Sequence, residues 1–270
     1  MIVDGRAIAS EILSSVREGM SRTAVVRAVT VSPTPATESY LSIKAARAKE
    51  AGMRLEVVRL TDAATDEDVM EAVTREGCDA VIVQLPLPEH LDEKKILNSI
   101  PEALDADVLS AMAYARFVID EEDALLPPVV AAVAEILERA KVSPGGKFAV
   151  VVGQGRLVGK PCTSWLMNEG AEVAVVTRES GDLSVLKEAQ IIITGAGSPG
   201  LIRPEHLSEG TVLIDAGTSE SGGAIVGDAD SACTSVVAVF TPVPGGIGPI
   251  AVACLFRNVA TLMERALQDG

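Results

Sequence analysis

The chain has 270 residues, which suits one large domain or two modest ones, and 48% of them are apolar. Its net charge of −15 and its aromatic share of only 3% argue against nucleic acid and anionic membranes as partners. No apolar run approaches a membrane span, MIVDGRAIAS is unlike a signal peptide, and the four cysteines lack metal-ligand spacing, so we expect a cytoplasmic protein without a metal site.

The first half of the chain alternates between helical and strand patterns. Apolar periodicity and capping signals predict helices over residues 4–20 and 34–52, another that begins at 65, and one over 92–99. Thr34 precedes Pro35 at one of these helix starts, and Thr65 with Asp68 has the spacing of a capping box. Apolar, β-branched runs predict strands over residues 24–31, 54–60 and 80–84. Strands that alternate with helices indicate a parallel sheet with crossover helices.

The second half repeats this rhythm. A helix is predicted over 129–140, and strands over 148–152, 172–176, 191–194, 211–215 and 236–240. A closing helix over 249–270 carries an apolar stripe and is expected to pack back on the first domain. We therefore predict an α/β protein of two domains, 1–125 and 126–248, each with a mainly parallel sheet flanked by helices. The C-terminal domain is predicted to be Rossmann-like.

The stretch KFAVVVGQGRLVGKP, residues 147–161, organises the second domain. A strand runs into the turn Gly153-Gln154-Gly155, and a helical pattern follows from about Gly159. Glycines let the backbone approach a ligand, and the free N–H groups of a helix N-terminus favour an anion, so this stretch can hold a diphosphate. The spacing is GxGxxxG rather than GxGxxG, and glycines that only serve the turn are the alternative.

Several polar side chains in the first domain are candidates for chemistry. Tyr40 and Lys44 lie four apart on one helix face, where they can move protons or, alternatively, stay solvated and half-buried. Short-chain dehydrogenases share this spacing, but there it follows the dinucleotide unit. Gln84 ends a buried strand, where ligands bind in open α/β sheets, or it satisfies the next turn. Asp105 and Asp107 lie in a polar loop and either bind a ligand or cap the turn.

These pieces, in this order, resemble the bifunctional methylenetetrahydrofolate dehydrogenase/methenyltetrahydrofolate cyclohydrolase family. The resemblance spans nearly the whole chain and rests on DGRAIA, PATESYLSIK, VIVQLPLP, DAD, VVVGQGRLVGKP, VLIDAG, IVGD and TPVPGGIGP. It implies oxidation of 5,10-methylenetetrahydrofolate to the methenyl form with NADP, and hydrolysis of that form to 10-formyltetrahydrofolate. It also implies a homodimer that serves one-carbon metabolism and purine biosynthesis.

The resemblance assigns roles to individual residues. Lys44 is the catalytic lysine, Tyr40 its neighbour over the substrate, and Gln84 a hydrogen-bond partner of the lysine. The residues implied to bind the folate are Asp107, Pro244, Gly245 and Gly246. Those implied to bind the nucleotide are Gly153, Gln154, Gly155, Val158, Gly159, Arg178 and Thr218. Arg178 suits the 2′-phosphate of NADP, whereas the adjacent Glu179 would suit the ribose hydroxyl of NAD.

The chain departs from the family pattern at three places. Val108 stands where the family has glycine, PPVVAA at 127–132 replaces a Pro-Cys-Thr-Pro-x-Gly stretch, and Ala251 replaces a threonine. Two alternatives remain: a dehydrogenase of a related one-carbon pterin carrier with little cyclohydrolase activity, or a nucleotide-binding regulatory protein whose folate site has decayed. The second is opposed by the joint presence of Tyr40, Lys44, Gln84 and Asp107.

Overall fold

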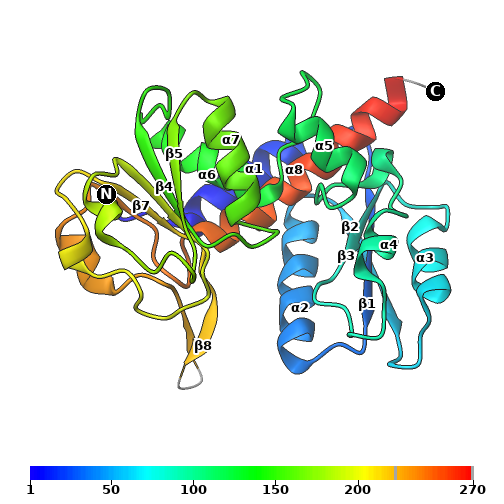
Figure 1. The fold of residues 1–270 in the computed structure, drawn as a ribbon. Coiled ribbons are helices and arrows are strands. Elements are labelled where there is room, and N and C mark those ends of the chain that lie inside the picture. The colour runs from blue at the N-terminus through cyan, green and yellow to red at the C-terminus, as the bar shows by residue number, and fades with distance from the viewer. Residues whose placement is uncertain (222–223, 269–270) are drawn as a thin grey trace. The chain divides into compact units, whose positions relative to one another are not determined.

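The computed structural model describes residues 1–221 and 224–268, and these fall into two compact units (Figure 1). The three-stranded unit comprises Ser10–Pro128 and Val252–Gly270, and the five-stranded unit comprises Met1–Ala9 and Val129–Ala251. Met1–Ala9 group with the five-stranded unit, whereas the sequence analysis assigned them to the first domain. The reason is that Val3 and Phe240 pair through their backbones. The Val3 amide donates to the Phe240 carbonyl, and the Phe240 amide donates to the Met1 carbonyl, both at 2.9 Å.

The three-stranded unit is a parallel sheet in the order β2-β1-β3. Its strands are β1 (Val25–Val31), β2 (Arg54–Leu60) and β3 (Ala80–Val83). Its helices are α2 (Pro35–Glu50), α3 (Asp66–Thr74), α4 (Glu93–Leu97) and α5 (Ala111–Val118), with a 3-10 turn at Glu102–Leu104. α3 packs on β1, and an apolar core that includes Val29, Val73 and Val83 lies between helices and sheet.

Local capping explains where two of these helices begin. The Thr34 side chain accepts from the Thr37 amide, and Pro35 takes the first helical position of α2. Thr65 and Asp68 form the reciprocal capping box that their spacing predicts, at the start of α3.

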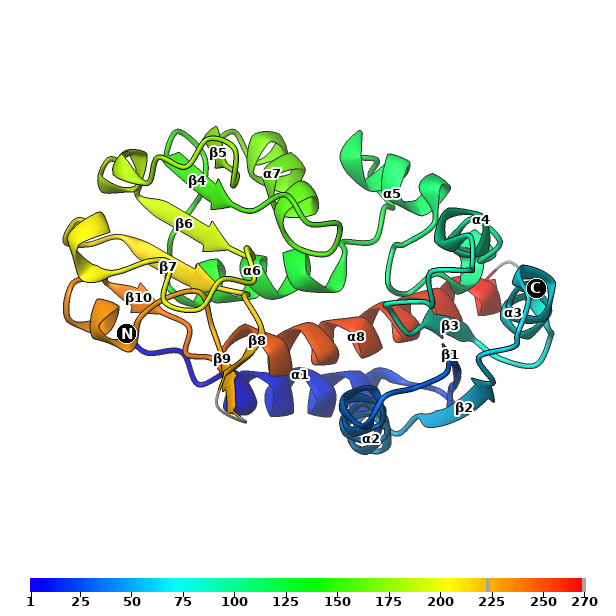
Figure 2. The ribbon, with the colours of Figure 1, turned by 60° about the horizontal axis from the view of Figure 1, so that its bottom comes forward.

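The five-stranded unit is a parallel sheet in the order β10-β7-β6-β4-β5 (Figure 2). The strands are β4 (Phe148–Val152), β5 (Glu172–Val176), β6 (Ile191–Thr194), β7 (Val212–Asp215) and β10 (Val239–Phe240). The helices are α6 (Pro128–Arg139) and α7 (Gly159–Asn168), and β8 (Ser219–Ser221) with β9 (Ala224–Val226) forms a small antiparallel ribbon. The chain leaves β4 for β5 on one side and later returns to β6 on the other. The strand order therefore reverses between β4 and β6, which in doubly wound sheets marks the ligand-binding crevice.

Two helices contain a boundary between the two units: α1 (Gly5–Gly19) and α8 (Ile247–Gln268). By length and composition alone α8 could cross a membrane, but 56% of its most apolar segment is buried inside the structure, as in a core helix. Its buried side chains include Leu255, Phe256, Val259 and Met263, four members of the predicted apolar stripe.

The predicted fold class is confirmed, with two parallel sheets flanked by helices. Three details differ from the expectation. β10 is shorter than the predicted strand because Ser231–Ser235 forms a 3-10 turn and Val236, which caps it, still has a turn conformation. The connections after β5 and β6 contain the short 3-10 turns Ser184–Lys187 and Pro204–His206 instead of full helices. α5 has no counterpart among the predicted helices.

Candidate active site

Lys44 and Gln84 meet in the three-stranded unit, one from α2 and the other from the carboxyl end of β3. Lys44 Nζ donates to Gln84 Oε1 at 3.1 Å, as the resemblance implies, and both side chains are half-buried. Gln84 Nε2 donates to the Leu85 carbonyl at 2.9 Å, which turns its oxygen toward the lysine. The Leu85–Pro86 peptide bond that follows is cis. The amide therefore orients the lysine rather than merely satisfying a turn.

The loop that carries Asp105 and Asp107 lies close to Lys44. Asp107 is half-buried, and desolvation raises the pKa of its carboxyl, an effect that the Lys44 charge opposes. Asp105 is fully buried and accepts from the amides of Leu109 (3.1 Å) and Ser110 (2.8 Å). Asp105 thus holds the turn, and Asp107 is the carboxylate of the pair that interacts with the lysine.

Val108 adopts a left-handed backbone conformation, with φ at 57°, at the position where the family pattern has glycine. This conformation costs a residue with a Cβ about 1–2 kcal/mol. Val108 is nevertheless buried, only 2% exposed, and so contributes apolar contact in return. The chain therefore keeps the glycine-type turn despite the departure. The departure at 127–132 lies at the start of α6, where Val130, Ala131 and Ala132 are buried in the core.

Asn258 of α8 holds the loop of Asp105 and Asp107 in place, and the sequence analysis did not identify it as a site residue. Its Nδ2 donates to the carbonyls of Ala106 and Leu126, both at 2.9 Å, and the residue is 6% exposed. Its signal in the sequence is only a polar residue inside the apolar stripe of a long helix.

Tyr40 lies one turn before Lys44 on α2 and is 42% exposed. Within the described part of the chain its hydroxyl makes no hydrogen bond. The structure thus brings together Lys44, Gln84 and Asp107, and leaves Tyr40 on the adjacent exposed surface.

The glycine turn after β4 fits closely against the loop after β6. Gly153 has φ at 96°, and a Cβ on it would lie 2.7 Å from the Gly195 carbonyl oxygen. A Cβ on Gly195 would lie 2.6 Å from Val158, and one on Gly159 would lie 2.1 Å from the Gly153 oxygen. Only glycine allows these approaches. Gly153, Gly159 and Gly195 therefore allow the close packing of the chain at the point where the strand order reverses.

The N-terminus of α7 opens beside this turn. α7 begins at Gly159, and Val158 before it offers no side-chain cap. Gln154 Nε2 donates to the Thr163 hydroxyl at 3.1 Å and so braces the turn on the helix. A Cβ on Gly155 would meet no atom within 4 Å, so space remains above the turn. The Lys160 amide donates to the Gly155 carbonyl at 3.1 Å and Pro161 has no N–H, so the Gly159 amide is the first-turn donor that this open space offers to a phosphate.

Two buried aspartates, Asp215 at the end of β7 and Asp228 after β9, were not predicted as site residues. Asp228 accepts from the Thr194 hydroxyl and from the amides of Ala196 and Ser198, each at 2.7 Å. Asp215, the last residue of β7, accepts from the amides of Gly217, Asp228 and Ala229 at 2.9, 3.2 and 2.8 Å. Burial raises the pKa of Asp215 to about 6, partly offset by these amides and increased by the Asp228 charge.

Arg178 and Thr218 are both exposed, after β5 and β7 respectively. Arg178 lies in a turn closed by the Thr177 amide and the Ser180 hydroxyl at 2.9 Å. The pKa of Glu179 is lowered, first by a hydrogen bond from Thr177 and last by the Arg178 charge. The Arg178 guanidinium makes no hydrogen bond or ion pair with the described residues, and its pairing with a 2′-phosphate stays a prediction.

The loop TPVPGGIGP, residues 241–249, belongs to the five-stranded unit and packs on the start of α1. Gly245 has φ at 104°, and the Gly5 amide donates to its carbonyl at 3.0 Å. A Cβ on Gly5 would lie 1.7 Å from the Gly246 oxygen, so this position accepts only glycine. Asp4 caps α1 by accepting from the amides of Arg6 and Ala7, both at 3.1 Å. The DGRA segment is therefore explained by its fit to this loop.

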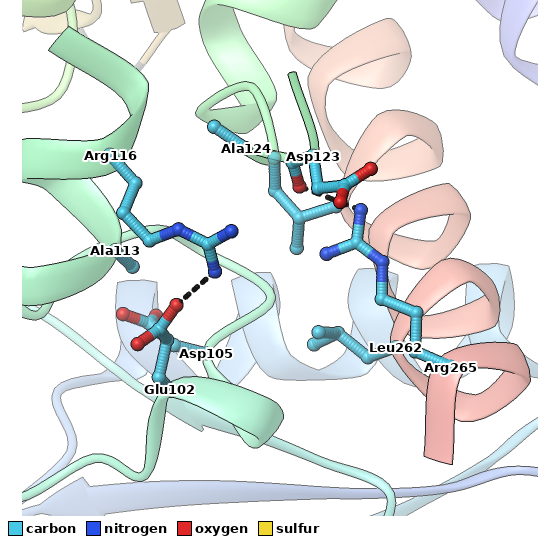
Figure 3. Close-up of a pocket in the computed structure, with 9 residues that line it drawn as sticks. Glu102, Asp105, Ala113, Arg116, Asp123, Ala124, Leu262 and Arg265 are labelled. Atoms are coloured by element: carbon cyan, nitrogen blue, oxygen red, sulfur yellow. Dashed lines mark hydrogen bonds and ion pairs between the residues drawn. The ribbon is translucent and has the colours of Figure 1, made fainter. Parts of the chain in front are cut away.

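Figure 3 shows a small cavity in the three-stranded unit, and neither Lys44 nor Gln84 is among the residues that line it. Its volume is about 20 Å³, room for about one water molecule. Arg116 is paired with Glu102 and Glu121, and Arg265 donates to the Asp123 carbonyl at 2.7 Å. Both arginines that line the cavity therefore already have partners. Of the two aspartates in the predicted polar loop, Asp105 lines the cavity and Asp107 does not.

The sequence matches two family models that together cover most of the chain. Residues 3–107 match the catalytic domain of tetrahydrofolate dehydrogenase/cyclohydrolase, and residues 127–267 match its NAD(P)-binding domain. The bifunctional protein FolD of Staphylococcus aureus (strain Newman) is 32% identical over 282 residues, covering 100% of this chain and 98% of the relative.

Solved structures agree over the same length. The bifunctional FolD enzyme of Campylobacter jejuni has a TM-score of 0.94 at 28% identity, covering 98% of this chain and 99% of that one. The Trypanosoma brucei N5,N10-methylenetetrahydrofolate dehydrogenase-cyclohydrolase, complexed with NADP cofactor and inhibitor, has a TM-score of 0.94 at 30% identity, covering 99% and 98%. The chain belongs to the tetrahydrofolate dehydrogenase/cyclohydrolase family.

Proposed function

We propose that the protein oxidises 5,10-methylenetetrahydrofolate to the methenyl form with NADP, and hydrolyses the methenyl form to 10-formyltetrahydrofolate. The observation that carries this proposal is the Lys44–Gln84 hydrogen bond of 3.1 Å close to the half-buried carboxyl of Asp107. A lysine held by an amide, next to a carboxylate that can accept pterin N–H groups, supplies both a proton-transfer group and an anchor for the substrate.

Each of these side chains has a distinct task. Gln84 fixes the direction of the Lys44 side-chain nitrogen, because its own Nε2 donates to the Leu85 carbonyl. In the hydrolysis, Lys44 in its amine form takes a proton from the water that adds to the methenyl carbon and passes it to solvent. The bond from that carbon to N5 then breaks, and the remaining hydroxyl proton goes to N5, which leaves the 10-formyl group. Asp107 accepts hydrogen bonds from the pterin ring, and Tyr40, one helical turn from Lys44, offers an exposed phenol to the substrate. For Pro244, Gly245 and Gly246 of the five-stranded unit, contact with the folate stays a prediction of the family resemblance.

The glycine turn of the five-stranded unit fits a dinucleotide. A Cβ at Gly153 or Gly159 would collide with backbone, whereas the space above Gly155 is open, as a diphosphate requires. We assign nucleotide contacts to these three glycines, to Gln154 and Val158, and to Thr218 after β7. When bound, NADP supplies the hydride acceptor. Arg178, exposed after β5, is proposed to pair with the 2′-phosphate.

We further propose a cytoplasmic homodimer. A reducing compartment suits the buried thiols of Cys162 and Cys233. Among the described strands β5 forms one edge of its sheet and exposes Val175 by 37%, so a second copy is a suitable partner for this edge. Light scattering of the wild type and of Val175→Lys tests the dimer; a monomeric wild type would contradict it.

The activity is tested by adding methylenetetrahydrofolate with NADP or NAD and following methenyl absorbance. Lys44→Met should lower the rate of methenyltetrahydrofolate hydrolysis by about 10²–10⁴-fold, the usual scale of acid–base catalysis. Dehydrogenation should fall less, because hydride transfer moves no proton. Lys49→Met, an exposed lysine on the same helix, is the matched control and should retain both activities. An unchanged hydrolysis rate in folded Lys44→Met would remove Lys44 from the reaction.

A further inference from the structure

Asp215 and Asp228 form an interlocked pair of buried carboxylates in the five-stranded unit. They are 1% and 0% exposed, and the Asp228 amide donates to Asp215. A Cβ on Gly217 would lie 2.3 Å from Cγ of Asp228, and one on Gly227 would lie 2.1 Å from Oδ2 of Asp215. Glycine at these two positions is therefore the condition for the pair to form.

All the donors to this pair are neutral in the described part of the chain: five backbone amides and one hydroxyl. Burying two acids side by side without a cation is costly, as the raised pKa of Asp215 indicates. Apolar residues would fill the same space at lower cost. Unlike apolar residues, the two carboxylates accept hydrogen bonds from backbone amides and so fix the conformation of that backbone.

That backbone is the loop after β6. Asp228 accepts from Thr194, the last residue of β6, and from the amides of Ala196 and Ser198, so it fixes both ends of residues 194–198. The Asp228 carbonyl also accepts from the Ile202 amide at 3.0 Å, so Asp228 holds the chain beyond residue 198 as well.

The same loop forms one wall of the point where the strand order reverses between β4 and β6. Gly195 lies so close to Gly153 and Val158 that a Cβ on either glycine would collide. A displacement of residues 195–198 would therefore change the space beside the glycine turn, where the nucleotide is assigned.

We propose that Asp228 is a positioning residue of the nucleotide site: it holds the loop after β6 in place and does not contact the ligand. Asp215, which accepts from the Asp228 amide, in turn holds Asp228 in position. This inference rests on the proposed function, because it concerns the NADP site of the dehydrogenase. It predicts a separation of activities. NADP binding depends on Asp228, whereas hydrolysis of methenyltetrahydrofolate, which uses no nucleotide, does not.

Three measurements on the full-length protein test it: NADP dissociation constants, the rates of both reactions, and hydrogen exchange at residues 195–198 without ligand. Asp228→Asn should raise the NADP dissociation constant and KM by about ten- to a hundredfold, the scale of a misplaced binding loop. At saturating NADP its kcat should stay within about threefold, and hydrolysis should be unchanged. The amides of Ala196 and Ser198 should exchange faster than in the wild type.

Two further variants keep the test decisive. Thr194→Val removes a single donor to Asp228 and should show a smaller shift of the same kind, whereas Thr194→Ser should restore NADP affinity. Asp230→Asn is the matched control, since Asp230 lies two residues on and caps the next 3-10 turn by accepting from the Ala232 amide at 2.8 Å. It should leave NADP binding unchanged.

Unchanged NADP affinity in Asp228→Asn and Thr194→Val, or an equal loss of both activities, would overturn the inference. A wild type that neither binds nor reduces NADP would instead refute the proposed function. Faster exchange at residues 195–198 in Asp228→Asn would still support the positioning of the loop in that case.

Discussion

Replacement of Asn258 by leucine tests how the DAD loop is held. Leucine has similar volume but no donor, so the carbonyls of Ala106 and Leu126 lose the hydrogen bonds that Nδ2 now makes at 2.9 Å. A buried unsatisfied polar group costs about 1–3 kcal/mol. Ala106 is fully buried and Leu126 only half-buried, so Asn258→Leu should lower the free energy of unfolding by about 2–4 kcal/mol.

The loss should also reach the substrate site, because Ala106 directly precedes Asp107. We expect a higher KM for methylenetetrahydrofolate and an unchanged NADP dissociation constant. Urea unfolding gives the stability, and initial rates give the KM. Thr261→Val is the matched control: it lies on the same helix but donates only to the Arg257 carbonyl at 3.2 Å. A change in unfolding free energy below about 0.5 kcal/mol, the range of ordinary surface substitutions, with an unchanged KM would refute the reasoning.

Four further outcomes are expected. Asp107→Asn should weaken folate binding by about ten- to a hundredfold, the value of one hydrogen bond to a charged acceptor, and leave NADP binding alone. Because burial raises the pKa of Asp107, folate affinity of the wild type should fall on acidification at a higher pH than for an ordinary aspartate; a titration of affinity against pH shows this. Arg178→Ala should lose its preference for NADP over NAD in initial rates, and a wild type that prefers NAD would contradict the assignment. The pKa of Asp215 rises from 3.8 to about 6 on folding. Its protonated form is thus favoured in the folded state, so stability should decrease by about 3 kcal/mol as pH rises from about 4 to about 6. Urea midpoints across this range should show that slope in the wild type and lose it in Asp215→Asn.

The sequence allowed prediction of those features whose causes are local. Thr65 and Asp68 contact each other across three residues, so their spacing alone predicts the capping box that the structure contains. Gly153 lies between an apolar strand and a helical pattern, and that order predicts the turn. The 3.1 Å bond between Lys44 and Gln84 joins residues forty apart, and only the family resemblance anticipated it.

The features that were missed depend on distant contacts. Asp228 accepts from donors thirty or more positions earlier, and nothing near IVGD indicates them. Asn258 binds carbonyls more than a hundred residues away. Val108 is of a residue type that disfavours positive φ, and its conformation is set by Asp105, whose carboxylate binds the next two amides. Tertiary contact overrides local preference at each of these sites.

Each compact unit is assembled from two separate stretches of the chain, and this bears on how the protein is made. The three-stranded unit contains both residues 10–128 and the segment from Val252, which includes Asn258. During synthesis its sheet emerges early, but the helix that satisfies the Ala106 carbonyl leaves the ribosome only after residues 129–251 of the other unit. Such a unit stays incomplete until this helix has been made, and its apolar surface is exposed meanwhile. A fragment cut after Pro128 would lack that helix, so either unit can be produced alone only by joining its two stretches with a linker.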